Sequence, residues 1–326
     1  MFQKIRIFLY SFFICSFLLL CGCGTASSQD KEPAAREENS SSPQSSLEEK
    51  KETGTIRSTI HTPLLPQTGE STLYENEAVS LDASENSKGY IILDYRGTAQ
   101  KAKLQIKLPD GTVYSYPLKQ ERVRSFPLPG GNGIYQISVL EHAYDDLYAV
   151  AFTQEIEVTL EDEFLPFLYP NQFSWYDASS KATLLGISLS EKSGSDLEYL
   201  EQVYLWVTEN ISYDNEKAEQ VTSDYVPNVD ETLQTGKGIC FDYASLMVAM
   251  LRSQNIPTKL EVGYSGQVYH AWISVYLTDH GWVDNIIELQ GNHWTLLDPT
   301  LASNNDKEAV SQYIGDGSNY TVKYHY

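Results

Sequence analysis

Apolar and polar side chains alternate in short runs through residues 56–163, and turn-forming residues separate the runs. Alternation with period two places the apolar side chains on one face of a strand. The turn signal of residues 109–112, PDGT, and the glycine-rich residues 130–133 separate such runs. The pattern predicts about seven short strands in an antiparallel sandwich of immunoglobulin-like type. The clearest strands are expected at residues 90–95, 103–107, 113–116, 134–140 and 152–160.

The hydrophobic spacing changes after residue 164. Apolar residues from Leu197 to Ile211 recur at steps of three and four behind Ser195, which predicts a helix with one buried stripe. A second helix is expected from Cys240 to Ser253, with Ala244, Met247, Met250 and Leu251 on its buried face. Runs of strand-like composition follow at residues 259–264, 268–277 and 294–297. Helices that precede an antiparallel sheet make residues 164–326 an α+β domain.

The first 55 residues have the composition of an export signal and a tether. Lys4 and Arg6 precede an apolar run of 14 residues that ends in a segment, Leu20 to Cys23, resembling a bacterial lipobox. Residues 1–22 are therefore expected to be a lipoprotein signal peptide. The alternative is a transmembrane helix, which needs about 20 apolar residues. Residues 23–55 are rich in Ser and Glu and are expected to form a disordered tether.

A lipobox implies that the thiol of Cys23 carries a diacylglycerol. The protein is then expected to be exported and lipid-anchored to the outer face of the bacterial cell membrane. Of the four cysteines, Cys15 and Cys21 leave with the signal, so only Cys240 remains as a free thiol. An isolated thiol in an oxidising compartment is either buried or chemically useful.

The chain is strongly acidic, with 23 basic and 44 acidic residues and a formal charge of −21. Such a surface repels phosphate backbones, so nucleic acid is not an expected partner. The acidity itself identifies no substrate, and a solvated surface that keeps an exported protein soluble explains it.

Cys240 lies at the predicted start of a helix, after a loop with two glycines. The positive end of the helix dipole and the free N–H groups of the first turn lower the pKa of a thiol and can bind an oxyanion. The competing interpretation is a buried structural cysteine.

A base for this thiol is available in the predicted strand of residues 268–275, VYHAWISV, which places His270 and Trp272 on one face. An imidazole beside a thiol can form a thiolate–imidazolium pair and then protonate a leaving amine. His280 and His293 lie in segments that read as turns, where histidine is usually solvated.

Asp298 ends the apolar run of residues 294–298 and can orient the imidazole by accepting a hydrogen bond from its second nitrogen. An ordinary Asp-Pro turn is the alternative interpretation of this segment.

Together these segments resemble the transglutaminase-like (papain-related) superfamily. Residues 236–244, GKGICFDYA, look like its nucleophile segment, His270-Ala271-Trp272 like its base strand, and residues 294–300 like its Trp-x-x-x-Asp-Pro-Thr strand. The resemblance implies that Cys240 is the nucleophile, His270 the general base and acid, and Asp298 the orienting group. Residues 285–293 look like an insertion between the last two strands.

The resemblance implies attack on an amide, either a glutamine carboxamide or a peptide bond, through a thioester. Water then gives a protease or amidase, and an amine gives a transglutaminase. Protein or peptide substrates are expected, such as cell-wall peptides, and no cofactor is implied. Two alternatives remain. One is a non-catalytic binding or scaffolding protein with the same fold. The other is a metal site that uses His270, His280 and His293 with Asp279 or Asp284, which no short two-histidine spacing on one element supports.

Overall fold

The computed structural model describes Arg57 and residues 61–119, 123–284, 287–290, 293–295 and 320–326. All of them belong to one compact unit, residues 50–326. Within these ranges, none of the helices is both long and apolar enough to cross a membrane. The predicted signal peptide and tether lie outside the described residues, and so does Cys23.

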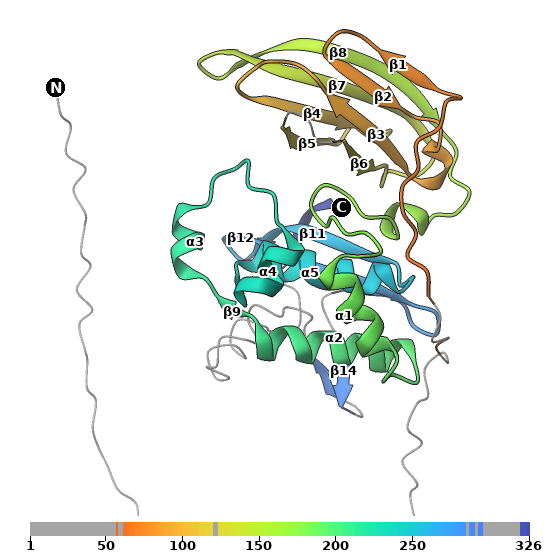
Figure 1. Cartoon of the computed structure of the whole chain (residues 1–326), viewed down its shortest axis with the longest axis vertical. Helices are drawn as coiled ribbons and strands as arrows, with labels where there is room; N and C mark the ends of the chain where they lie inside the picture. The colour runs from red at the N-terminus through yellow and green to blue at the C-terminus, as the bar shows by residue number, and fades with distance from the viewer. Residues whose placement is uncertain (1–56, 58–60, 120–122, 285–286, 291–292, 296–319) are drawn as a thin grey trace, which may run out of the picture. The chain divides into compact units, whose positions relative to one another are not determined.

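The first half of the described chain is an all-β sandwich, as the alternating pattern predicts (Figure 1). One antiparallel sheet has the strand order β1-β2-β3-β6 and the other β5-β4-β7-β8. The strands are β1 (Leu73–Glu75), β2 (Val79–Asp82), β3 (Tyr90–Tyr95), β4 (Ala102–Lys107), β5 (Val113–Leu118), β6 (Arg124–Pro127), β7 (Gly133–Tyr144) and β8 (Leu147–Val158). The short 3-10 helix η1 (Asn86–Lys88) lies between β2 and β3.

Side-chain alternation explains how the two sheets pack. In β4, Ala102, Leu104 and Ile106 are buried, whereas the polar residues between them face outward. Tyr116 of β5 and Phe126 of β6 join the two sheets, with an edge-to-face contact and ring centroids 5.0 Å apart. The inner faces of both sheets therefore share one apolar core.

The second half is α+β, and its main sheet is antiparallel with the order β13-β12-β11-β16. The helices are η2 (Leu165–Phe167), α1 (Lys181–Ser190), α2 (Asp196–Asn210), α3 (Asn215–Gln220), α4 (Val229–Thr235) and α5 (Cys240–Ser253). The strands are β9 (Ser212–Tyr213), β10 (Lys237–Gly238), β11 (Thr258–Ser265), β12 (Val268–Leu277), β13 (Gly281–Asp284), β14 (Ile287–Gln290), β15 (His293–Thr295) and β16 (Tyr320–His325).

The two predicted helices are confirmed as α2 and α5. The side chain of Ser195 caps α2 by accepting a hydrogen bond from the N–H of Glu198 at 3.1 Å. The prediction that α5 buries a single face is wrong, because every side chain from Asp242 to Ser253 is buried, on all sides of the helix. α5 packs against β11 and β12 and also against α1, α2 and α4, so it is the central helix of this half (Figure 1).

The end of the chain departs from the expected strand order. β15 pairs with β14 in a separate two-stranded sheet. Of the strand predicted at residues 294–297, the structure describes residues 294 and 295, and these belong to β15 rather than to the main sheet. Within the insertion expected at residues 285–293, Ile287–Gln290 forms β14, which pairs antiparallel with β15. The edge of the main sheet beside β11 is instead taken by β16, which the sequence pattern did not predict.

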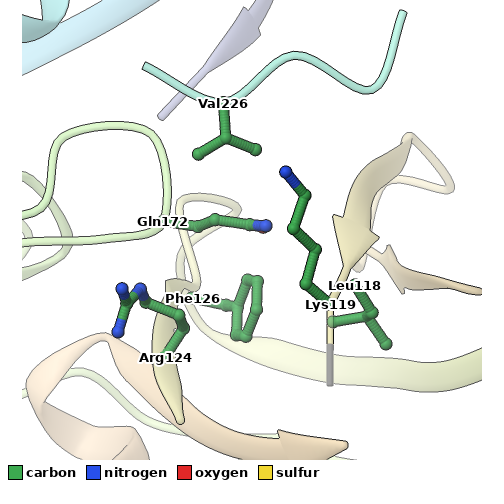
Figure 2. A pocket seen from close by; sticks show the side chains of 6 residues that line it. All are labelled: Leu118, Lys119, Arg124, Phe126, Gln172 and Val226. Atoms are coloured by element: carbon green, nitrogen blue, oxygen red, sulfur yellow. The ribbon is translucent and has the colours of Figure 1, made fainter. Parts of the chain in front are cut away.

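Aromatic and polar contacts join the two halves. The phenol of Tyr114 accepts a hydrogen bond from the N–H of His325 at 3.0 Å, and its ring packs edge-to-face on Tyr326. The hydroxyl of Ser125 donates to the carbonyl of Pro170 at 2.6 Å. Figure 2 shows a small cavity at this junction, lined by side chains from both halves: Leu118, Lys119, Arg124, Phe126, Gln172 and Val226.

Candidate active site

Cys240 is the first residue of α5, as the sequence predicts. Its side chain is half-buried, and the preceding residue, Ile239, has the extended backbone of an N-cap. The first turn of a helix presents N–H groups that have no intrahelical acceptor, and the helix dipole adds partial positive charge there. This position favours a thiolate and can bind negative charge that develops on a neighbouring carbonyl oxygen.

Backbone contacts hold the loop before Cys240 in place. Gly236 ends α4 in the left-handed conformation at φ 64°, and its N–H donates to the carbonyl of Thr232. The carbonyls of Gly236 and Gly238 accept hydrogen bonds at 2.9 Å from the N–H groups of Ser212 and Asp214. The parallel pairing of β9 with β10 therefore ties the segment after α2 to the cysteine loop.

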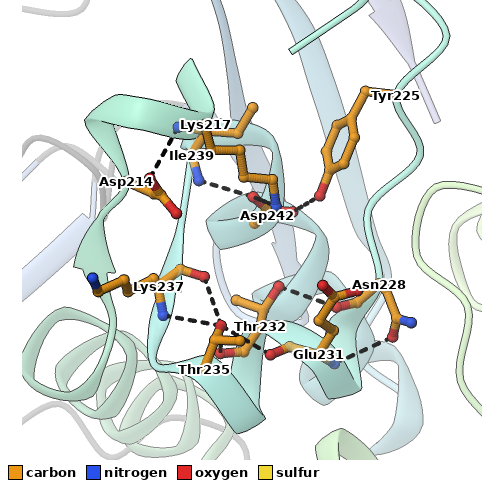
Figure 3. Close-up of polar contacts among 10 residues, drawn as sticks. All are labelled: Asp214, Lys217, Tyr225, Asn228, Glu231, Thr232, Thr235, Lys237, Ile239 and Asp242. Atoms are coloured by element: carbon orange, nitrogen blue, oxygen red, sulfur yellow. Dashed lines mark hydrogen bonds and ion pairs between the residues drawn. The ribbon is translucent and has the colours of Figure 1, made fainter. Parts of the chain in front are cut away.

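Asp242, two residues after the cysteine, is a buried acidic residue that the sequence analysis does not single out. It is fully buried, and its carboxylate accepts hydrogen bonds from the N–H of Ile239 at 2.9 Å, from Nζ of Lys217 at 2.7 Å and from the phenol of Tyr225. Burial and the negative charge of Asp242 raise the pKa of Tyr225 well above its usual range, so the phenol stays protonated as a donor. Figure 3 shows these contacts converging on one carboxylate.

The only sequence signal for this arrangement is an acidic residue at the N3 position of a helix, which is typical of a capping box. That signal does not reveal the partners, because Lys217 and Tyr225 are 25 and 17 residues away in the chain.

His270 is the third residue of β12 and lies directly opposite Gly263 of β11. The predicted alternation is confirmed: Ala271 and Ile273 belong to the core, whereas the rings of His270 and Trp272 lie nearly parallel with centroids 6.2 Å apart. His270 is half-buried and Trp272 is buried. A side chain at position 263 would collide with the carbonyl of Thr321 on β16, so the strand opposite the histidine requires glycine.

The structure brings together the helix that carries Cys240 and the strand that carries His270, because α5 packs on β12. Asp298 lies outside the described residues, so its orienting role stays a prediction. The assignment of Cys240 and His270 as a catalytic pair is also still a prediction, resting on position and residue type.

An open groove of about 540 Å³ borders the cysteine loop. Its walls come from α3, α4 and the segment between them, and they carry side chains of both charge signs. Asp214, Lys217, Tyr225, Glu231 and Lys237 are among the lining residues (Figure 3). Lys217 and Tyr225, which donate hydrogen bonds to Asp242, also form part of this groove.

Among the described residues, no three His, Cys, Asp or Glu side chains gather in a way that could hold a metal ion. His280 is exposed at the turn after β12, where its N–H donates to the carbonyl of Leu277. His293 is the first residue of β15 rather than part of a turn.

A free thiol at the start of a buried central helix, next to an antiparallel sheet that carries a histidine, is an arrangement suited to nucleophilic catalysis by cysteine. Residues 185–285 match the model of the transglutaminase-like superfamily. The matched segment contains both Cys240 and His270. Asp298 lies beyond the matched residues.

Two curated proteins are similar to parts of the chain. UPF0252 protein MJ1282 of Methanocaldococcus jannaschii is 35% identical over 88 residues, which cover 23% of this chain and 25% of that protein. The kyphoscoliosis peptidase of Mus musculus is 27% identical over 150 residues, which cover 38% of this chain and 22% of that protein. The chain thus spans about a quarter of the length of these relatives.

Among solved structures, red sea bream transglutaminase is similar with a TM-score of 0.29 and 15% sequence identity, over 67% of this chain and 48% of that one.

Proposed function

We propose that this protein is a cysteine enzyme that cleaves or transfers amide groups, with Cys240 as nucleophile, His270 as general base and acid, and Asp298 as the group that orients His270. The proposal depends above all on the position of Cys240 as the first residue of α5, directly after a loop that backbone hydrogen bonds hold in place. The match of residues 185–285 to the model of the transglutaminase-like superfamily supports it.

In the proposed reaction, His270 takes the proton of the Cys240 thiol, and the thiolate sulfur forms a bond to the carbonyl carbon of the substrate amide. The carbonyl oxygen becomes an oxyanion, which the N–H of Cys240 stabilises. When the oxyanion collapses, the C–N bond breaks, and the imidazolium gives its proton to the leaving ammonia or amine. The product is a thioester on Cys240.

The group that resolves the thioester decides the reaction. Water attacks with His270 as base and gives a carboxylic acid, which is the reaction of a protease or amidase. A primary amine gives a new amide, which is the reaction of a transglutaminase. The groove beside the cysteine loop is lined by side chains of both charge signs together with uncharged polar ones, which supports a protein or peptide as the substrate.

The direct test is the rate at which iodoacetamide alkylates Cys240 as a function of pH, measured in the full chain by mass spectrometry of the Cys240 peptide. The wild-type rate should rise with a midpoint well below the value of about 8.5 for a free thiol, and His270→Ala should remove that shift. His280→Ala serves as a matched control, because this histidine is exposed in a turn and should leave the midpoint unchanged.

A Cys240 that is inert, or that titrates as a free thiol in both wild type and His270→Ala, would contradict the enzyme proposal. That result would favour the alternative of a binding or scaffolding protein with a transglutaminase-like fold.

Hydroxylamine distinguishes the two outcomes of the thioester. With a glutamine-containing peptide, an enzyme that accepts amines converts the glutamine carboxamide to a hydroxamate, whereas a strict hydrolase gives glutamate. Mass spectrometry of the peptide reports both products, and Cys240→Ala should give neither.

We further propose that the protein acts outside the cell, held at the membrane by a lipid on Cys23, with peptides of the cell surface as substrates. The lipobox-like sequence from Leu20 to Cys23 supports this location. Cys23→Ala should move the protein from the membrane fraction to the soluble fraction without changing the alkylation rate of Cys240. Unchanged membrane retention would count against lipidation.

A further inference from the structure

We infer that Asp242 is a positioning residue for Cys240, which fixes the helix turn that carries the thiol and balances the charge around it. The inference rests on the proposed function, because it assigns a role within the reaction of Cys240. Three observations carry it: the backbone contact of the carboxylate, its two side-chain partners and its complete burial.

Asp242 cannot be the base of the reaction. Residues two positions apart in a helix are about 200° apart around its axis, so the carboxylate and the thiol lie on opposite sides of α5. Asp242 instead acts through the backbone, because its carboxylate accepts a hydrogen bond at 2.9 Å from the N–H of Ile239, the residue before the cysteine. This contact fixes the direction in which the chain enters the helix at Cys240.

The carboxylate is itself fixed from two sides. Nζ of Lys217, at the middle of α3, lies 2.7 Å from one oxygen, and the phenol of Tyr225 donates to the other. Nζ of Lys217 also lies 4.5 Å from the centroid of the Tyr225 ring, which adds a cation–π contact. The cysteine turn is thereby linked to α3 and to the segment between α3 and α4, both of which line the groove (Figure 3).

There is no room for Asp242 to move toward the loop. A Cβ at Gly238 would lie 2.6 Å from the Cβ of Asp242, so the glycine before Ile239 allows the close approach. A buried carboxylate without partners is strongly unfavourable, and Lys217 supplies the compensating charge.

This arrangement predicts opposite electrostatic effects at the thiol. Asp242→Asn removes a negative charge and leaves Lys217 unbalanced, so the thiolate of Cys240 should be favoured and alkylation should be faster. Lys217→Met removes the positive charge and leaves Asp242 unbalanced, so the thiolate should be disfavoured and alkylation should be slower. The other charged residues of the surrounding groove, Asp214, Glu216, Glu231 and Lys237, are the same in both variants.

The test is the pH midpoint of iodoacetamide alkylation of Cys240 in the full chain, for wild type, Asp242→Asn and Lys217→Met. Shifts of about half a pH unit or more in opposite directions are expected, which change the alkylation rate at a fixed pH below the midpoint by about threefold. Glu231→Gln is the matched control, because it removes a carboxylate from the same groove that does not contact Lys217 or Asp242, and its shift should be smaller.

A purely structural role of Asp242 would lower thermal stability in both variants and shift the midpoints in the same direction or not at all, which would overturn the inference. If Asp242→Asn does not fold, Lys217→Met alone decides, because this lysine is partly exposed and its loss must still raise the midpoint. A wild-type thiol that titrates as a free thiol would refute the proposed function, whereas opposite shifts in the variants would still show that Asp242 and Lys217 set the charge around Cys240.

Discussion

Arg252 provides a quantitative test of how the central helix is held. It lies near the end of α5, is fully buried, and donates one hydrogen bond to each of three carbonyls. Nε contacts Thr258 at 2.8 Å, and the two terminal nitrogens contact Tyr169 at 2.8 Å and Tyr326 at 2.6 Å. One guanidinium thus joins the helix to the start of β11, to the segment after η2 and to the end of the described chain.

The contribution of Arg252 to the free energy of unfolding can be worked out from these three hydrogen bonds. A hydrogen bond from a charged donor contributes about 1.5–3 kcal/mol, so three give about 4.5–9 kcal/mol. Part of this gain offsets the cost of burying the charge, since no carboxylate among the described residues pairs with Arg252 and burial lowers its pKa to about 10. Arg252→Met should therefore lower the free energy of unfolding by about 3–5 kcal/mol, a large share of the about 5–15 kcal/mol typical of a domain.

Urea unfolding followed by circular dichroism measures this difference. Arg96→Met is the matched control, because Arg96 is exposed and makes only surface ion pairs with Glu75 and Asp94, which contribute at most about 1 kcal/mol. A loss below about 1 kcal/mol for Arg252→Met, or equal losses in the two variants, would refute the role assigned to the buried guanidinium.

Three further predictions concern the loop, the tyrosines and the start of the folded unit. Gly238→Ala places a methyl group against Asp242 and should slow alkylation of Cys240 by about tenfold or more, and an unchanged rate would contradict the tight packing. Burial raises the pKa of Tyr114 to about 12, above its usual value near 10. The stability that the neutral phenol contributes is therefore complete below pH 10 and is lost between pH 10 and 12. The free energy of unfolding in urea should be clearly lower at pH 11 than at pH 9. Arg57→Ala removes a 2.6 Å ion pair with Asp196 and should lower the free energy of unfolding by about 2 kcal/mol, and a loss under about 0.5 kcal/mol would contradict its importance.

Local patterns predicted the elements of this fold well. The helix of Asp196–Asn210 follows from a capping serine and apolar steps of three and four, and the helix of Cys240–Ser253 begins and ends where the sequence pattern places it. Alternation in β4 and β5 likewise gives both the strands and their inward faces. Helix bounds and strand faces depend on residues that are close together in the chain, so they can be predicted from one sequence.

The features that depend on distant residues could not be predicted in the same way. β16 pairs with β11 although more than 50 residues separate them in the chain, and no local signal in Tyr320–His325 identifies its partner. The burial of α5 on all sides follows from the sheet and the three helices around it. Asp242 was part of the quoted cysteine segment, yet its role became visible only when the structure placed Lys217 and Tyr225 against it.

Formation of an acyl-enzyme on Cys240 tests the central claim most directly. The full chain is mixed with p-nitrophenyl acetate, and mass spectrometry locates the acetyl group in wild type, Cys240→Ala and His270→Ala. Rapid acetylation at Cys240 in wild type, no acetylation of residue 240 in Cys240→Ala and slow acetylation in His270→Ala are predicted. An unmodified Cys240 in wild type, or equal rates in wild type and His270→Ala, would contradict the assignment of Cys240 as a nucleophile activated by His270.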